Sequence, residues 1–355
     1  MFEILKKEEV NTKRQYNLDI LKTLAVISMI MAHAILQFGR HKPGFEDDIL
    51  YNIGAYFFAD YFAVAHAFMF ALGVGLIFSR NNDPKDLIKR GFKIYLMGYV
   101  LNFFRYGIYN LLVTLITGKV SKSLWNSLFE QDILQFAGLA MIVTGIFKML
   151  KLDIKVILVL SIVLSAIGSF FSYLDTGNFA LNLIVGHFIA TTDISDFVFF
   201  NWYIFVALGM LFGLIIRRIS DLDVFYKKLL IISGALSIIY IALTMKFGMF
   251  FLSKSNRYYS LGTLEVFGLL SLDLFILSVA YFIVDKLGKR TLHFCTGVSK
   301  TVNEMYIIHW IIIGFIDCVF CYGMGVLMPY RLIYVIGILL VVVSYWIAGK
   351  KRKNP

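Results

Sequence analysis

The chain has 355 residues, of which 59% are hydrophobic and 16% are charged, and its formal net charge is +11. A soluble globular domain carries about 25% charged residues, so this composition excludes an ordinary soluble protein and indicates a membrane protein. The apolar stretches are continuous over about 20 residues, unlike the short alternating strands of a β-barrel. The basic residues lie in small groups between these stretches, which is typical of cytoplasmic loops and gives no indication of nucleic-acid binding.

Ten stretches are long and apolar enough to be candidate membrane spans. In chain order they cover residues 18–38, 56–78, 87–109, 133–150, 156–173, 198–216, 229–251, 264–284, 302–322 and 330–348. We therefore expect an all-α fold, a polytopic transmembrane helical bundle of about ten spans, with a short interfacial helix near 51–59. Residues 18–348 are expected to form a single transmembrane domain, after a cytoplasmic segment (1–17) and before a basic cytoplasmic tail (349–355).

The first span contains Ala32-His33-Ala34, which is similar to a signal-peptidase site. The apolar run from Leu18 is longer than the 7–15 residues of a usual signal-peptide core, so we expect an uncleaved span. The distribution of Lys and Arg gives the orientation. With both termini inside, 24 basic residues lie in cytoplasmic segments and 8 in outer ones. This excess predicts that both termini are cytoplasmic.

The three cysteines are Cys295, Cys318 and Cys321, too few for a disulfide framework. Cys318 and Cys321 lie one turn apart in an apolar run, and no other Cys or His group in the sequence completes a metal-ligand set with them. They are interpreted as packing residues, and no metal is expected.

The first span carries two polar residues whose burial in lipid is costly. A charge near the bilayer centre costs about 2.5–3.5 kcal/mol on insertion scales. Lys22 lies near the expected cytoplasmic side and His33 about 16 Å further along the helix, on the same face. Lys22 is explained equally well by pairing with Asp19, three residues earlier. His33 has no such neighbour and is the stronger candidate for a functional residue, although a packed structural histidine remains an alternative.

Further polar residues interrupt the later spans. They are Asp60 and His66, Asn102 and Arg105, Asp132 and Gln135, Glu265 and Asp273, and Asn303, Tyr306 and His309. Tyr306 and His309 are three residues apart and share a helix face. Asp273 lies deep in its span without a neighbour in sequence, and we expect a buried partner on another helix. Snorkelling or helix pairing explains Arg105 at least as well as contact with a substrate.

An imidazole near neutral pH serves as a general base or as a nucleophile, and moving an acyl group from a thioester to a hydroxyl or amine requires one of these. A cation near the cytoplasmic surface can hold the phosphates of coenzyme A, and a Tyr or Asn can stabilise a developing oxyanion. These residues alone fit a transporter with a proton-relay histidine nearly as well.

Four stretches resemble polytopic membrane acyltransferases. Leu18-Asp19-Ile20-Leu21-Lys22 followed by His33 resembles the Leu-Asp-x-x-Arg…His opening of the acyltransferase-3 family, with Lys22 in place of arginine. The remaining three are closer to the heparan-α-glucosaminide N-acetyltransferase type. They are the His66–Gly75 stretch with its FxFxxGxG pattern, the Asp132–Ala140 stretch around Leu134-Gln135, and Tyr306-Ile307-Ile308-His309-Trp310. The four stretches occur in the expected order across the ten spans, and the resemblance covers most of the chain.

The resemblance implies an acyltransferase that takes an acyl group, expected to be acetyl, from cytoplasmic acetyl-CoA to a saccharide or other cell-envelope acceptor on the outer side. It implies His33 as the catalytic histidine and Lys22 as the basic residue near the donor. The full set expected to line the donor and acceptor cavity is Asp19, Lys22, His66, Asn102, Arg105, Gln135, Tyr306 and His309. Lysine lacks the bidentate phosphate contact of arginine, so this departure weakens the role of Lys22.

The expected protein is therefore a multi-pass plasma-membrane O- or N-acetyltransferase that uses acetyl-CoA, contacts membrane lipids and binds no nucleic acid. Its oligomeric state is left open, with a homodimer as one option. The basic loops 79–91 and 285–300 are candidate coenzyme A contacts, and the outer loop 174–197, which includes Asp193, is a candidate acceptor entrance. The alternative is a transporter or flippase of a cell-envelope intermediate, which predicts inverted repeats and broken helices, and neither is found in the sequence.

Overall fold

The computed structural model describes residues 4–61, 65–80, 83–118, 127–191, 195–248 and 258–353. Within these ranges every regular element is a helix, and β-pairing is limited to two isolated bridges, Leu5 with Ile219 and Gln131 with Ser195. The expected all-α fold is confirmed.

A helix lies at each of the ten expected spans. They are α1 (Tyr16–Gly39), α3 (Ala65–Phe78), α4 (Pro84–Asn102), α7 (Ile133–Met149), α8 (Ile154–Phe170), α10 (Phe199–Arg218), α11 (Leu222–Phe247), α12 (Thr263–Ile283), α14 (Val302–Ile316) and α15 (Tyr330–Lys353). Among the described residues, 7 helical stretches are long and apolar enough to cross a membrane, whereas α3, α7 and α8 are shorter apolar helices. The chain is therefore an integral membrane protein. The cytoplasmic location of its termini stays a prediction.

Several shorter helices complete the fold. They are α2 (Ile49–Ala55), α5 (Tyr109–Thr117), α9 (Phe179–Val185) and α13 (Lys289–Lys300), with π-helical segments η3 (Tyr56–Tyr61), η4 (Phe103–Ile108) and η7 (Asp317–Gly323) and 3₁₀ segments η2 (Phe45–Asp47), η5 (Tyr258–Ser260) and η6 (Val284–Lys286). The expected interfacial helix near 51–59 corresponds to α2 and η3.

Two segments differ from the expectation. The third span was expected to end near residue 109, but its helix continues through η4 into α5, because apolar residues persist until Gly118. Gly118 has a φ of 68°, the left-handed conformation in which glycine commonly ends a helix. Helix α13 was not expected, because its buried side consists of only Cys295 and Val298. Such a helix has no continuous apolar run in its sequence.

The described contacts divide the chain into two compact units that are interleaved in the sequence. Unit 1 comprises residues 1–17, 66–99 and 129–283, and unit 2 comprises residues 18–65, 100–128 and 284–355. The expectation of a single transmembrane domain remains a prediction. Each unit is described below by itself.

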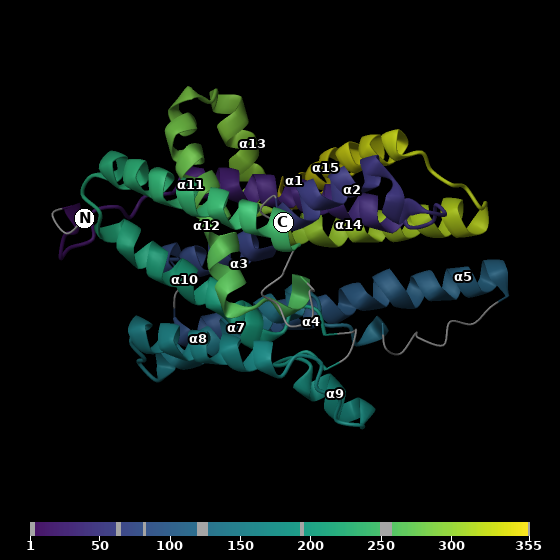
Figure 1. The fold of residues 1–355 in the computed structure, drawn as a ribbon, viewed down its shortest axis with the longest axis horizontal. Coiled ribbons are helices and arrows are strands. Elements are labelled where there is room, and N and C mark those ends of the chain that lie inside the picture. The colour runs from purple at the N-terminus through teal and green to yellow at the C-terminus, as the bar shows by residue number, and fades with distance from the viewer. Residues whose placement is uncertain are drawn as a thin grey trace. The chain divides into compact units, whose positions relative to one another are not determined.

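In unit 1, α8 packs against α10 and α11 packs against α12 (Figure 1). Glycines permit close helix crossings. A Cβ on Gly73 would collide with the Val206 carbonyl oxygen of α10, and one on Gly209 would collide with the Phe70 carbonyl oxygen of α3. The first glycine of the FxFxxGxG stretch, Gly73, therefore permits close packing of α3 against α10.

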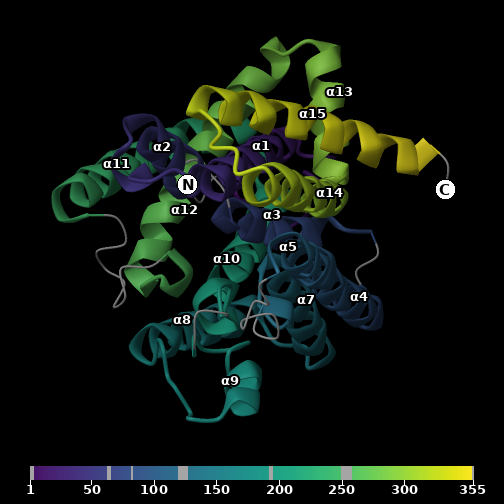
Figure 2. The same cartoon turned by 90° about the vertical axis from the view of Figure 1, so that its right-hand side faces the viewer.

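In unit 2, α14 and α15 lie side by side, as Figures 1 and 2 both show. Helix α1 lies mostly in this unit, and most of its apolar side chains are buried. It approaches α15 closely at Gly337, where an added Cβ would lie 2.6 Å from the Met31 sulfur. Helices α1 and α15 are therefore in direct contact within this unit.

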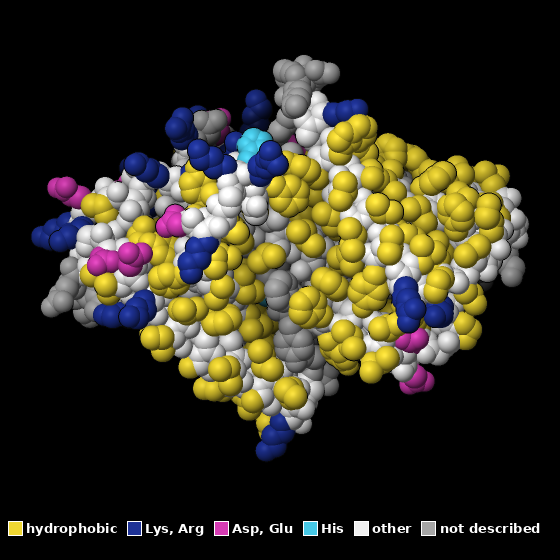
Figure 3. Space-filling view, turned by 90° about the horizontal axis from the view of Figure 1, so that it is seen from above, with side chains coloured by type: hydrophobic (Ala, Val, Ile, Leu, Met, Phe, Trp, Pro, Cys, Tyr) yellow, Lys and Arg dark blue, Asp and Glu magenta, His cyan; other side chains and the backbone are white. Residues whose placement is uncertain are grey.

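Exposed hydrophobic side chains are abundant in the described parts of the chain, including Ile238, Leu115 and Met245, which are 71%, 73% and 80% exposed. On the face drawn in Figure 3, hydrophobic side chains cover much of the visible surface and the basic side chains form separate groups. Such a surface fits a lipid environment and would be unfavourable in water.

Candidate functional site

The centre of the candidate site is a pair of histidines from α1 and α14, both in unit 2. His33 Nδ1 lies 2.8 Å from His309 Nε2, and the two imidazole rings are nearly parallel and joined edge to edge, with 5.1 Å between centroids and 5° between planes. His309 is completely buried, whereas His33 is partly accessible. The two residues are separated by 276 positions in the sequence, and the fold brings them into direct contact.

The backbone of α14 determines which ring nitrogens carry protons. His309 Nδ1 lies 2.9 Å from the Met305 carbonyl oxygen, which only accepts hydrogen bonds, so His309 carries its proton on Nδ1. Its Nε2 is then an acceptor and receives the hydrogen bond from His33 Nδ1–H. His33 Nε2 consequently has a lone pair, and no hydrogen bond to it is found within the described ranges. A neutral imidazole with a bare Nε2 is the form that acts as a base or nucleophile.

Three further side chains of unit 2 surround the histidine pair. The Trp310 ring lies 4.3 Å from the His33 ring, centroid to centroid, and the Tyr306 ring meets His33 edge-on at 6.3 Å. The Arg105 guanidinium stacks on Trp310, with its carbon 3.5 Å from the ring centroid. A cation–π contact partly replaces the hydration that arginine loses away from water. Arg105 lies in the π-helical segment η4, a local geometry that occurs frequently at functional sites.

Four of the nine site residues expected from the sequence thus come together: His33, Arg105, Tyr306 and His309. Trp310 was not included, although it directly follows His309 in the Tyr-x-x-His-Trp stretch. The signal was therefore present, but an apolar aromatic residue in a span is ordinarily a packing residue.

The remaining unit 2 candidates have structural contacts of their own. Asp19 is buried and accepts a hydrogen bond from the Thr296 hydroxyl of α13 at 3.3 Å. Asn102 is also buried, and its amide donates to the Leu128 carbonyl oxygen at 3.2 Å. Lys22 is partly exposed on α1, between Asp19 and His33. Their expected roles in substrate binding stay predictions.

Gln135, in unit 1, is fully engaged at the start of α7. The Asp132 side chain caps this helix through the Ile133 N–H at 2.7 Å, and Gln135 Oε1 accepts from the Asp132 N–H at 3.2 Å, forming a capping box. Gly98 of α4 packs directly on this amide, since an added Cβ would lie 2.5 Å from it. The Leu-Gln stretch therefore has a structural function in the fold, and its role as cavity lining stays untested.

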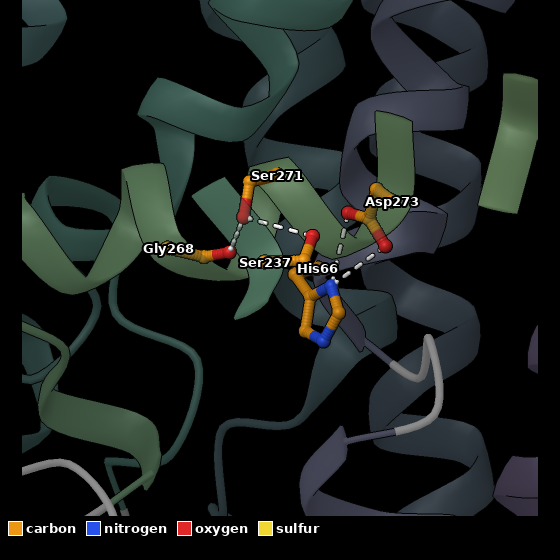
Figure 4. Close-up of polar contacts among 5 residues, drawn as sticks. All are labelled: His66, Ser237, Gly268, Ser271 and Asp273. Carbon is orange, nitrogen blue, oxygen red and sulfur yellow. Dashed lines mark hydrogen bonds and ion pairs between the residues drawn. The ribbon is translucent and has the colours of Figure 1, made fainter. Parts of the chain in front are cut away.

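His66, also in unit 1, pairs with the carboxylate expected to need a buried partner. Its Nδ1 lies 2.9 Å from both Asp273 oxygens, and both side chains are fully buried. Figure 4 shows the imidazole turned so that Nε2 points away from Asp273, and Nε2 has no hydrogen-bond partner in the part of the chain that the structure describes. The expectation of an interhelical partner for Asp273 is confirmed.

The outer-loop candidate contains a second histidine cluster of unit 1. His187 Nε2 lies 2.7 Å from the Tyr95 hydroxyl and 2.8 Å from the Tyr99 hydroxyl. Burial lowers the pKa of His187, because it disfavours the imidazolium form. Asp193 of the same loop lies outside the described residues.

One of three comparisons with known proteins gave a match. A family model described as "Heparan-alpha-glucosaminide N-acetyltransferase, catalytic" matches residues 14–245. The match includes His33 and Arg105 and ends before Tyr306 and His309. Comparisons with curated proteins and with solved structures gave no match. Since the matched segment is more than half of the chain, the protein belongs to the heparan-alpha-glucosaminide N-acetyltransferase catalytic-domain family and is a membrane acetyltransferase.

Proposed function

We propose that the protein transfers an acetyl group from acetyl-CoA to the hydroxyl or amine of a saccharide or other cell-envelope acceptor, with His33 as the catalytic residue. One observation carries the proposal. The hydrogen bonds from His33 to His309 and from His309 to the Met305 carbonyl leave His33 Nε2 unprotonated at a partly accessible position. The family match supports the acetyltransferase class.

In the proposed reaction His33 acts as a general base. Its Nε2 takes the proton of the acceptor as the acceptor oxygen or nitrogen attacks the thioester carbonyl carbon. The carbon–sulfur bond breaks as the new bond forms, and the proton passes from Nε2 to the sulfur of coenzyme A. The charge that develops on the imidazole is shared with His309 through their hydrogen bond. General base catalysis of this kind contributes about 10²–10⁴-fold to the rate.

Arg105 is the proposed stabiliser of negative charge in this reaction. Its guanidinium is always protonated and presents five donors in a planar fork, and stacking on Trp310 fixes its orientation. Fixed donors of this type favour an oxyanion that develops in the transition state. Tyr306, whose ring meets both histidines edge-on, is proposed to hold the imidazoles in their hydrogen-bonded arrangement.

The proposed direction of transfer follows from the charge distribution. The excess of Lys and Arg in alternate loops favours cytoplasmic termini, and on this basis the donor is proposed to bind on the cytoplasmic side near Lys22 and the acceptor on the outer side of the plasma membrane. His33, about 16 Å along α1 from Lys22, then lies between the two substrates.

The test uses the full-length protein in detergent with radiolabelled acetyl-CoA and a panel of amino sugars and α-glucosaminides. We expect release of free coenzyme A together with a labelled sugar, and a loss of about 10²–10⁴-fold in kcat for His33→Ala. His309→Gln keeps an acceptor for His33 Nδ1–H and should retain most activity, whereas His309→Leu removes the acceptor and should not. Melting temperatures of all variants control for folding.

Three outcomes would change the proposal. If His33→Ala matches the wild type, the assignment of the base is wrong. If protein-bound label accumulates on His33 without acceptor, the histidine is a nucleophile that forms an acetyl-enzyme. If proteoliposomes take up a glycan while no acetyl transfer occurs with any acceptor, the transporter alternative replaces the enzyme.

A further inference from the structure

A second polar cluster of unit 2 surrounds the carboxylate of Asp317, in the π-helical segment η7 that continues α14. The side chain of Asp317 is fully buried, although ionised carboxylates are expensive to place in an apolar span. Its Oδ1 lies 2.6 Å from His41 Nε2, and its Oδ2 accepts a hydrogen bond from the Gln37 amide at 2.7 Å. The buried carboxylate is therefore held firmly by the C-terminal end of α1 and the residues that follow.

Cys321 adds a soft ligand to the same cluster. The ligand atoms of His41, Asp317 and Cys321 all lie within 4.8 Å of one another. Asp317 and Cys321 are four residues apart on η7, and His41 reaches them from the other end of the chain. An imidazole nitrogen, a carboxylate oxygen and a thiolate sulfur are the three ligand types that zinc uses in proteins.

The spacing is close to what a tetrahedral ion requires. Ligands at 2.0–2.3 Å from zinc lie about 3.3–3.8 Å from one another, so side-chain shifts of about 1 Å bring all three atoms to a common centre. We propose that His41, Asp317 and Cys321 bind a divalent transition-metal ion of the zinc type, with water in the fourth position. Binding would release the thiol proton of Cys321 to solvent, because the thiolate is the ligand.

The surroundings of the cluster resemble an outer shell around metal ligands. Gln37 orients the carboxylate through the oxygen that does not contact His41. The guanidinium of Arg40 lies 3.8 Å from the same oxygen and is 46% exposed, so it can move toward solvent when an ion arrives. The Tyr322 ring meets the His41 ring edge-on at 4.9 Å and limits its rotation. Partners of this kind hold ligands in the orientation that a metal needs.

This inference departs from the expectation that Cys321 is a packing residue and that no metal is bound, whereas Cys318 keeps its expected role in packing. The sequence could not indicate the site, because its third ligand is 276 positions from Asp317. The inference is independent of the proposed acetyl transfer, since it concerns binding and not activity. A failure of either one therefore leaves the other intact.

The experiment measures metal binding directly. The full chain, purified in detergent with a tag that contains no histidine run, is stripped with a chelator and titrated with Zn²⁺ or Co²⁺. We expect about one equivalent of zinc per chain by elemental analysis, a higher melting temperature with Zn²⁺, and a thiolate-to-cobalt charge-transfer absorption with Co²⁺. Proton release on titration gives a second readout for Cys321.

Matched variants assign the ligands. Cys321→Ser should abolish the charge-transfer absorption and His41→Ala the stoichiometric zinc, whereas Cys318→Ser, in the same segment, should change neither. Gln37→Leu should weaken binding by about 10–100-fold, as is usual for an outer-shell partner. The inference is overturned if wild-type protein binds no stoichiometric metal, or if bound metal is unaffected by both Cys321→Ser and His41→Ala. The cluster would then be a hydrogen-bonded anchor for α1.

Discussion

The buried pair of His66 and Asp273 gives a prediction whose size follows from the structure. Both side chains are fully buried, and His66 Nδ1 contacts both carboxylate oxygens at 2.9 Å. Asp273→Leu removes both contacts of His66 Nδ1, and Nε2 already has no hydrogen-bond partner in the described residues. The imidazole is then buried without a hydrogen bond. An unsatisfied buried polar group costs about 1–3 kcal/mol, so we expect Asp273→Leu to destabilise the protein by about that amount.

His66→Leu should destabilise the protein more than Asp273→Leu does. His66→Leu leaves the Asp273 carboxylate buried without this partner, and breaking a buried charged pair from that side costs about 3–5 kcal/mol. The double variant removes both polar groups, and replacing a buried pair with apolar residues is often neutral or stabilising. We therefore expect the order of stability to be wild type and double variant, then Asp273→Leu, then His66→Leu.

The measurement is a double-mutant cycle on the purified protein in detergent, with denaturant or thermal unfolding of all four forms. Coupling between neighbours of 0.5–3 kcal/mol is typical of contacting residues. If the double variant loses as much stability as the two single variants together, the pair is not energetically coupled and the reasoning is refuted. A coupling of only about 0.6 kcal/mol would match an ordinary interhelical hydrogen bond in a membrane and would argue against a charged pair.

Two further predictions concern unit 1. Because the pKa of His187 is lowered in the folded protein, a fall in pH protonates this histidine first in the unfolded chain, near pH 6.5. The stabilising contribution of neutral His187 should be complete above that pH and should decline as the pH falls below it. His187→Gln should flatten the melting temperature between pH 5 and 7 relative to wild type, and an unchanged profile would contradict the assignment. Gly73→Ala should lower stability by about 1–3 kcal/mol through overpacking against Val206, whereas Gly75→Ala, whose Cβ meets nothing within 4 Å, should be neutral or stabilising. Equal melting temperatures for the two alanine variants would show that the close crossing of α3 and α10 is not constrained.

The helices of this protein could be predicted because their signal is local. An apolar run of about 20 residues identifies a span whatever its neighbours are, and a helix lies at each of the ten expected positions. Helix α13 and the extension into α5 were not predicted, because neither matches the pattern of a single apolar run of span length. The first is amphipathic with a small buried face, and the second continues beyond a conventional span length.

The candidate site was predictable in part. His33, Arg105, Tyr306 and His309 stand out in the sequence because polar residues in apolar spans are costly and therefore require a reason. The same argument selected Gln135 and His66, whose contacts are a helix cap and a carboxylate. A polar residue inside a span signals a partner, and the sequence does not say whether that partner is a substrate or another side chain.

The sequence by itself determined the membrane class, the order of the helices and the resemblance to membrane acetyltransferases, and it selected His33 as the candidate catalytic residue. Only the tertiary structure decided which residues meet. In the structure, His309 and Trp310 contact His33, and Asp273 contacts His66. His41 lies beside Asp317 and Cys321. These contacts join positions more than 200 residues apart, and they depend on how each helix is rotated against its neighbours. No local sequence pattern encodes that rotation, because it results from packing between residues that are far apart in the chain.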